Sequence, residues 1–169
     1  MLKILMLLSV SIANLAHAAN MPLSVTPNRI SAPLTAGSIT GGKAADSFTL
    51  TKITRENAPN GIEKWSLTYG DRMGRPLVAG PGFFHVSIDR NSRRIVIDLA
   101  QVHRTAVEPR QLEQLAKASK LVASSDMIMD PQDHSTNITL TMKTAVSVRV
   151  ASESTGGGKL VLLVAPANK

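Results

Sequence analysis

The sequence alternates apolar and polar residues over several short runs, and this alternation restricts the fold more than any other feature. The two clearest runs are FHVSID (84–89) and RIVIDLA (94–100), with RNSR (90–93) between them. In each run every second residue is apolar, which places the apolar side chains on one face of an extended strand. Because only four residues separate the runs, we predict a β-hairpin whose apolar face is turned toward a core.

Further runs with the same period predict a domain that is rich in strands. The expected strands are SFTLTKITRE (47–56), KWSLTYG (64–70), NITLTM (137–142), AVSVRVA (145–151) and KLVLLVA (159–165). The segment 108–122 differs, because its apolar residues recur at steps of three and four. Together with Pro109 in the expected first turn, this spacing predicts an amphipathic helix over about 109–119. The pattern as a whole predicts an all-β fold, a β-sandwich of two facing, mainly antiparallel sheets with one short amphipathic helix inserted.

The N-terminal residues are typical of a secretory signal peptide. Lys3 precedes an apolar run over 4–15, and small residues stand at Ala16 and Ala18, so we predict cleavage near Ala18. The apolar run is shorter than the roughly 20 residues that span a bilayer. We therefore expect an exported, periplasmic protein without a transmembrane segment after signal removal.

Two further regions follow the predicted signal peptide. Residues 19–46 are rich in Pro, Gly, Ser, Thr and Ala and lack a sustained period, so we expect a flexible N-terminal segment with one short strand near 28–34. Residues 47–169 contain all the other expected strands and the helix. They are long enough for one domain with its own core.

The composition narrows the class of partner. The chain has no Cys, which excludes disulfides, thiolate metal sites and Cys nucleophiles. Its formal net charge is +7, and loss of residues 1–18 would remove one cation, Lys3. A basic surface favours an anionic partner, and in the periplasm this means a wall polymer or lipid head groups rather than nucleic acid. Aromatic residues make up 3% of the chain, which weakens the case for stacking on bases or sugars.

Arginines cluster around the best-defined expected strand and the connection that follows it. They are candidates for a cationic patch that binds an anionic ligand; the alternative, which we do not favour less, is a set of separate, solvated charges. The candidate residues are Arg93, Arg94, Arg104 and Arg110.

The stretch MDPQDHSTNITL (129–140) concentrates Asp, His, Asn and hydroxyl side chains. A calcium loop of the EF-hand type would need a central Gly and a closing Glu, and both are absent. A zinc site could draw on His85, His103 and His134, but their spacing matches no metal-binding motif. Asp130-Pro131 favours a turn, and Asp133 could bond to its own backbone. We therefore predict a turn between two strands, and no metal or cofactor.

Motifs for catalysis are equally scarce. The sequence contains neither a G-x-S-x-G nucleophile elbow nor a P-loop. Glu108 and Glu113 cannot be assigned as an acid and base pair without a pocket. We therefore expect a binding protein without catalytic residues, and not an enzyme.

The run RNSRRIVIDLAQV (90–102) resembles the signature strand of the AMIN domain, a small module of the bacterial cell envelope. In that family an Arg-containing turn leads into a strand of the type R-[IVL]-V-[IV]-D-L. Residues 135–164 are similar to the second half of the family, in which two strands, a Gly-rich turn and a final apolar strand follow one another. The resemblance covers roughly 47–165.

The resemblance implies a non-catalytic β-sandwich, because AMIN modules attach envelope enzymes or secretin complexes to the cell wall. Three hypotheses about function follow. The first is a periplasmic module that binds peptidoglycan or places an envelope partner on it. The second is an accessory or assembly subunit of a secretion or pilus system that binds protein by strand addition at a sheet edge. The third, which we favour least, is a small metal-dependent hydrolase built on the histidines.

Overall fold

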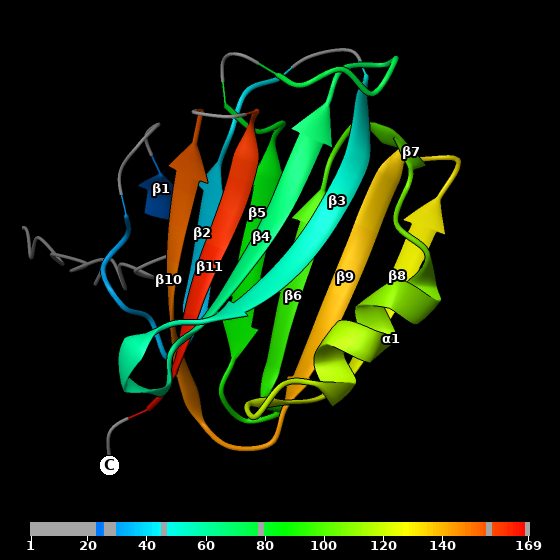
Figure 1. The fold of residues 1–169 in the computed structure, drawn as a ribbon. Coiled ribbons are helices and arrows are strands. Elements are labelled where there is room, and N and C mark those ends of the chain that lie inside the picture. The colour runs from blue at the N-terminus through cyan, green and yellow to red at the C-terminus, as the bar shows by residue number, and fades with distance from the viewer. Residues whose placement is uncertain (1–22, 26–29, 45–46, 78–79, 155–156, 168–169) are drawn as a thin grey trace, which may run out of the picture.

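Two facing β-sheets form the body of the protein in a computed structural model that describes residues 23–25, 30–44, 47–77, 80–154 and 157–167 (Figure 1). The six-stranded sheet has the order β1-β2-β5-β6-β9-β8, and the five-stranded sheet has the order β10-β11-β4-β3-β7. The elements are β1 Leu23–Val25, β2 Gly37–Gly41, β3 Phe48–Asn57, the 3-10 turn η1 Pro59–Gly61, β4 Glu63–Gly70, β5 Phe84–Asp89, β6 Arg94–Leu99, β7 Val102–Thr105, α1 Pro109–Lys117, β8 Val122–Asp130, β9 Ser135–Met142, β10 Val146–Glu153 and β11 Lys159–Pro166.

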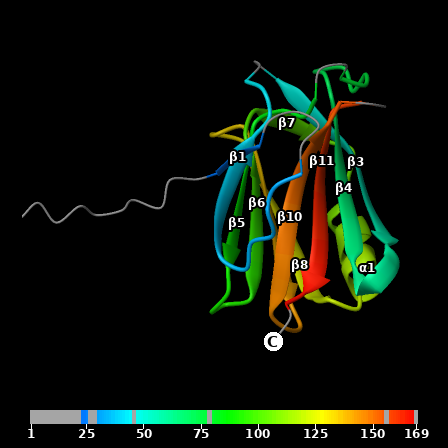
Figure 2. The same ribbon diagram turned by 90° about the vertical axis from the view of Figure 1, so that its left-hand side faces the viewer.

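The two sheets lie face to face, as the side view shows (Figure 2). Neighbouring strands are antiparallel except in the pairs β1–β2 and β3–β7, which are parallel. The predicted β-sandwich with one short helix is therefore confirmed. Within the described ranges, no helix has the length and apolar character that a bilayer crossing requires.

The predicted hairpin is β5 and β6, and its apolar face lies in the core. Val86 pairs with Ile97 across the hairpin, and both side chains are buried. Trp65, Leu67 and Tyr69 project from β4 into the same core, as their alternation with polar residues predicts. The core is thus built from the inward faces of both sheets, the usual arrangement of a β-sandwich.

Two hairpin turns in the six-stranded sheet use the same local chemistry. Asp89 begins the β5–β6 turn, and its Oδ1 accepts hydrogen bonds from the backbone N–H groups of Asn91 and Ser92. Asp130 begins the β8–β9 turn in the same way. Each turn ends on a residue with positive φ, 54° at Arg93 and 50° at His134. An aspartate that bonds to the backbone of its own turn therefore fixes each connection.

The helix α1 (Pro109–Lys117) lies within the predicted range and packs against β8. Its first turn is closed by a capping box in which Glu108 and Gln111 exchange side-chain and backbone hydrogen bonds. Leu112 is buried in the core and Leu115 is half-buried against it, as expected for the apolar stripe.

The flexible segment predicted over 19–46 needs correction, because the packed fold begins before Ser47. β2 (Gly37–Gly41) pairs with β5 inside the six-stranded sheet, and Ile39 is fully buried. Leu34 forms a bridge with Val148 on β10, and so covers the edge of the other sheet. The strand expected near 28–34 is represented by isolated bridges in its described part. The predicted signal peptide, 1–18, lies outside the described residues.

Candidate functional site

Arg93 and Arg94, two of the four candidate arginines, lie together at one end of the β5–β6 hairpin. Both are exposed, and with Arg90 they line a small hollow beside the β9–β10 connection. Arg93 is oriented by a hydrogen bond of 3.0 Å from its Nη1 to the carbonyl oxygen of Lys143. We call Arg90, Arg93 and Arg94 the arginine cluster.

The other two predicted arginines lie elsewhere. Arg104 is on β7, where it lines a hollow of about 690 Å³ that also contains Asp71 and Arg72. Arg94 begins β6, whereas Arg104 follows the end of that strand. A strand of six residues is about 17 Å long, so the two arginines lie well apart. Arg110 is exposed in the first turn of α1. The structure therefore does not bring the four predicted residues into one patch.

The stretch 129–140 forms the turn that the sequence predicts, between β8 and β9. The side chain that accepts the hydrogen bonds in this turn differs from the expectation. Asp130, rather than Asp133, supplies the carboxylate that accepts hydrogen bonds from the turn backbone, at 2.8 Å from Gln132 and 3.2 Å from Asp133. Asp133 itself is exposed. Its position inside the turn lets it donate its N–H to Asp130, and this geometry explains the correction.

Two of the three histidines come together, but they stack rather than form a ligand set. The rings of His103 on β7 and His134 in the β8–β9 turn lie 3.9 Å apart, inclined by 23°. His85 lies on β5, on the polar face of the six-stranded sheet, opposite Asp98. Among the residues that the structure describes, no three His, Asp or Glu side chains are placed to hold a metal ion.

The outer face of the five-stranded sheet carries two shallow hollows. One, of about 340 Å³, lies over β3, β4 and the start of β11, and the other, of about 420 Å³, lies over β10, β11 and η1. They adjoin, because Leu163 of one pairs with Lys64 of the other across the sheet. We call this joint surface the sheet trough, and its cationic residues are Lys52, Lys64, Lys159 and Arg149.

Two cross-strand rows define the sheet trough. The first runs over β10, β11, β4 and β3 and consists of Arg149, Leu163, Lys64 and Glu56. The second follows the same strands and consists of Glu153, Lys159, Thr68 and Lys52. The polar residues point outward because the alternate positions of each strand fill the core.

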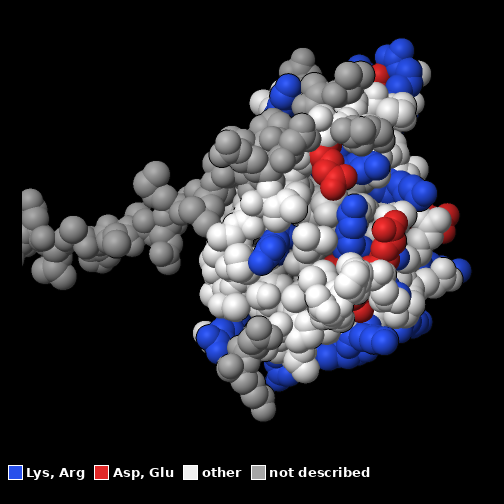
Figure 3. Space-filling model, turned by 60° about the vertical axis from the view of Figure 1, so that its left-hand side comes forward, with Lys and Arg blue, Asp and Glu red and all other residues white. Residues whose placement is uncertain are grey.

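Charges of both signs occur in the sheet trough, with cations in excess. Glu153 forms an ion pair of 3.7 Å with Lys64 at half-exposed positions. Blue and red atoms alternate over the right half of Figure 3, which shows this sheet obliquely. Four cations against Glu56 and Glu153 leave a net positive surface. We did not predict this set, although the outward positions of Lys52 and Lys64 follow from the alternation of their strands.

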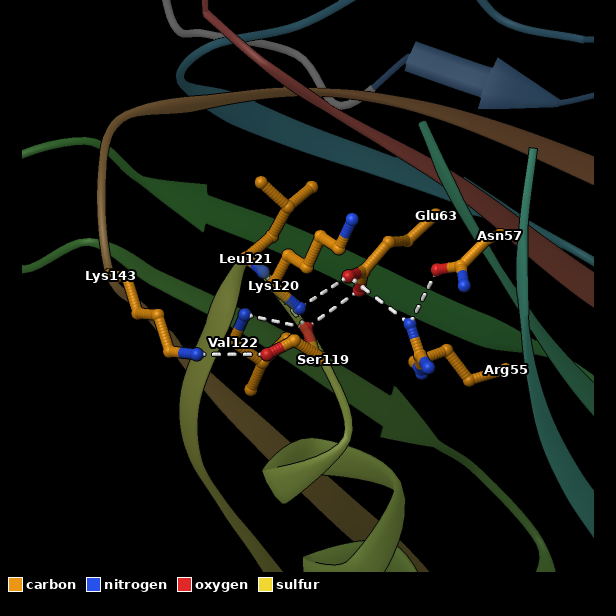
Figure 4. Close-up of polar contacts among 8 residues, drawn as sticks. All are labelled: Arg55, Asn57, Glu63, Ser119, Lys120, Leu121, Val122 and Lys143. Atoms are coloured by element: carbon orange, nitrogen blue, oxygen red, sulfur yellow. Dashed lines mark hydrogen bonds and ion pairs between the residues drawn. The ribbon is translucent and has the colours of Figure 1, made fainter. Parts of the chain in front are cut away.

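A buried carboxylate joins α1 and β8 to the five-stranded sheet. Glu63, at the start of β4, is only 2% exposed. It accepts hydrogen bonds from the Ser119 hydroxyl (2.6 Å) and the Lys120 backbone N–H (2.7 Å), and it forms an ion pair of 3.2 Å with Arg55 (Figure 4). A buried carboxylate needs such partners. Two of these partners, Ser119 and Lys120, lie just before β8 in the chain. We therefore interpret this group, the Glu63 clamp, as an anchor for the start of β8.

The Glu63 clamp continues into the backbone that follows the helix. The Ser119 oxygen accepts hydrogen bonds from the N–H groups of Leu121 (3.0 Å) and Val122 (2.7 Å). Lys143 Nζ donates to the Ser119 carbonyl oxygen at 2.8 Å, which ties the β9–β10 connection to the same point. The sequence gives no sign of the clamp, because Glu63 and Ser119 are far apart along the chain.

No family model, no curated protein and no solved structure matches this chain. The AMIN resemblance therefore stays a prediction.

Proposed function

We propose that this chain is a non-catalytic binding module of the bacterial periplasm that associates with peptidoglycan, or places an envelope partner on it, through the sheet trough. The observation that carries the proposal is the pair of adjoining hollows with an excess of lysine and arginine side chains. The predicted signal peptide, the net charge of +7 and the β-sandwich fold support the same assignment.

The chemistry of the sheet trough suits an extended anionic polymer. Peptidoglycan carries carboxylates along its peptide stems, and Lys ammonium groups on flexible stems can meet them without strict geometry. The outer residues between the cations are small, such as Ser66 and Thr68, so a chain could lie close to the sheet. An interaction of exposed charges is weak per pair and screened by salt. We therefore expect binding of moderate strength that falls as ionic strength rises.

The test compares two triple variants that remove the same charge from different surfaces. In the first, Lys52, Lys64 and Lys159 are replaced by Gln. In the second, Arg90, Arg93 and Arg94 of the arginine cluster are replaced by Gln. Binding of each purified protein to isolated sacculi is measured by sedimentation over a range of salt concentrations. We expect the lysine variant to lose most of its binding and the arginine variant to keep it, because only the former changes the sheet trough.

Two outcomes would contradict the proposal. One is wild-type binding that is absent or indifferent to salt. The other is equal loss in both variants, which would indicate a response to net charge alone. Loss confined to the arginine variant would instead favour the arginine cluster, which contains two residues of the patch that the sequence predicts.

A second candidate function is that of an accessory subunit of a secretion or pilus system that binds protein by strand addition. The observation that favours it is the edge strand β8, on which Ile128 is 60% exposed and Met129 is 40% exposed. Co-purification of a secretin or pilus component with the wild type, and its loss with Ile128→Lys, would support this alternative. Retention of the component by Ile128→Lys would contradict it.

A further inference from the structure

The four edge strands of the sandwich differ greatly in how open they are. β1 and β7 are three and four residues long, and β10 is covered by bridges to Ile30 and Leu34. β8 is nine residues long, and no described segment pairs with it on the side away from β9. A long, open edge presents unpaired N–H and C=O groups to any extended chain that meets it.

β8 also lacks most of the features by which proteins usually blunt such an edge, although its Asp126 is charged and exposed. Its sequence, VASSDMIMD, contains no Lys, Arg or Pro, and its single irregularity lies at the start, between Val122 and Ser124. The remaining seven residues, Ser124–Asp130, form a regular strand. They expose Ile128 and Met129, two of the five large apolar side chains exposed in the described part of the chain. In Figure 1 this half of β8 stands beyond α1, at the right-hand edge.

We propose that β8 pairs antiparallel with β8 of a second copy of this chain and joins the two six-stranded sheets into one. Directly opposed residues of an antiparallel pair share a face, so a two-fold axis normal to the sheet must pass midway between one residue and the same residue of the second copy. We name each axis by that residue. An axis through Met127 uses all of Ser124–Asp130. It sets Met127 against Met127 of the second copy, and Asp126 against Ile128 of the second copy.

Charge singles out this register among its neighbours. Moving the axis by one residue to Asp126 would oppose the two Asp126 carboxylates directly. Moving it the other way, to Ile128, would oppose Asp126 to Asp130 of the second copy. Both shifts place like charges directly opposite, which destabilises a strand pair. The axis at Met127 avoids both directly opposed pairs, and it makes the two exposed Ile128 side chains, and likewise the two Asp126 side chains, only diagonal neighbours.

The predicted dimer is weak and concentration-dependent. A single pair of strands is smaller than a standard interface of about 1,200–2,000 Å², so we expect dimerisation only at high protein concentration. Both copies have the same net positive charge, so added salt should strengthen the dimer or leave it unchanged. Wall binding by the sheet trough should respond to salt in the opposite sense. The inference goes beyond the proposed function and can fail independently of it.

The first test is sedimentation equilibrium of the chain without the predicted signal peptide, residues 1–18, from low micromolar to near millimolar concentration. We expect a reversible monomer–dimer equilibrium in the wild type. Ile128→Lys places a cation on the exposed edge and should weaken dimerisation by at least about tenfold. Met73→Lys is the matched control, because Met73 is an apolar residue that is 75% exposed on the β4–β5 loop. A wild type that is monomeric throughout, or a dimer that survives Ile128→Lys, would overturn the proposal.

The second test uses the absence of Cys from the chain. In antiparallel pairs opposed Cα atoms lie about 4.5–5.5 Å apart, a separation that a disulfide can bridge. Met127→Cys should therefore form covalent dimers under mild oxidation much faster than Met73→Cys. Equal rates for the two variants would overturn the proposed register. Sacculus binding by Ile128→Lys should equal that of the wild type, so failure of dimerisation and failure of wall binding are distinguishable.

Discussion

The two ends of β8 are held in opposite ways. At its start, the backbone N–H groups of Leu121 and Val122 bond to Ser119, whose hydroxyl donates to the buried Glu63. At its far end, Ile128 and Met129 are exposed, and the carboxylate of Asp130 holds the turn that follows. One end of the strand is thus fixed from inside the fold, and the other presents its edge to solvent.

This contrast shows how a small sandwich can offer an open edge without losing the strand. Fraying of an edge strand costs little when only one neighbour holds it. The Glu63 clamp raises that cost at the start of β8, because the strand cannot leave without exposing a buried, bonded carboxylate. The free edge is therefore expected to stay extended and ready for pairing.

The largest expected effect comes from breaking the clamp itself. Glu63→Ala removes the partner of Arg55, whose side chain is only 11% exposed, and leaves Ser119 and Lys120 without their acceptor. Loss of one member of a buried ion pair costs roughly 3–5 kcal/mol. Urea unfolding should show this loss, and Glu63→Gln, which keeps an acceptor, should lose less. Glu113→Ala, at an exposed position on α1, is the control. A change below about 1 kcal/mol in Glu63→Ala would contradict the clamp.

A smaller effect is expected at Ser119. Ser119→Ala removes one hydroxyl that donates to Glu63 and accepts from two backbone N–H groups, all in a buried setting. Leaving buried polar groups unpaired costs about 1–3 kcal/mol. The control is Ser124→Ala on β8, where the residue is exposed and the change should stay within about 0.5 kcal/mol. Equal unfolding free energies for the two variants would remove the contrast between the ends of β8.

At the open end of β8, we expect a modest loss of stability when Asp130 is replaced. Asp130→Ala removes the acceptor for two turn N–H groups and should cost about 1 kcal/mol. Asp133→Ala lies in the same turn without such a role and should stay within about 0.5 kcal/mol. Thermal unfolding of the pair provides the measurement. A larger loss from Asp133→Ala than from Asp130→Ala would show that the turn is held differently.

The smallest expected effect is a pH dependence of stability that comes from Asp89 in the β5–β6 turn, which resembles the Asp130 turn. Hydrogen bonds from the Ser92 hydroxyl and from the N–H groups of Ser92 and Asn91, together with the charge of Arg94, lower the pKa of Asp89. Its stabilisation is therefore complete above the ordinary aspartate pKa of about 3.9 and is lost as the pH falls through the lower folded value. The difference in unfolding free energy between the wild type and Asp89→Asn should shrink in acid. A difference that is constant with pH would contradict this assignment.

The sequence predicted those parts of the fold in which alternation is complete. β5 and β6 were predicted because all of their inward residues are large and apolar and most of their outward residues are polar. β8 was not predicted, because an edge strand has fewer neighbours to satisfy and Ser125 stands among its inward positions. β2 was missed for a related reason: its one buried large residue, Ile39, stands between glycines and resembles a linker.

The candidate surfaces were less predictable than the strands. The turn at 129–140 followed from local chemistry, since Asp130-Pro131 acts on its own neighbours. The sheet trough depends on which strands lie side by side, and Lys159 meets Lys52 only through the order β11-β4-β3. The Glu63 clamp depends on a contact between residues 56 positions apart. Such long-range pairings are set by topology, which alternation alone does not specify.

Amide hydrogen exchange of β8 tests the central claim most directly, because it reports on both ends of the strand in one experiment. The Val122 amide, bonded to Ser119, should be protected at every protein concentration. The amides between Ser124 and Asp130 whose N–H groups point away from β9 should exchange fast in dilute protein. They should become protected as the protein concentration rises, and Ile128→Lys should abolish that rise in protection. Exchange in Ser124–Asp130 that does not depend on concentration would contradict the account of β8 as an anchored, open edge that pairs with a second copy.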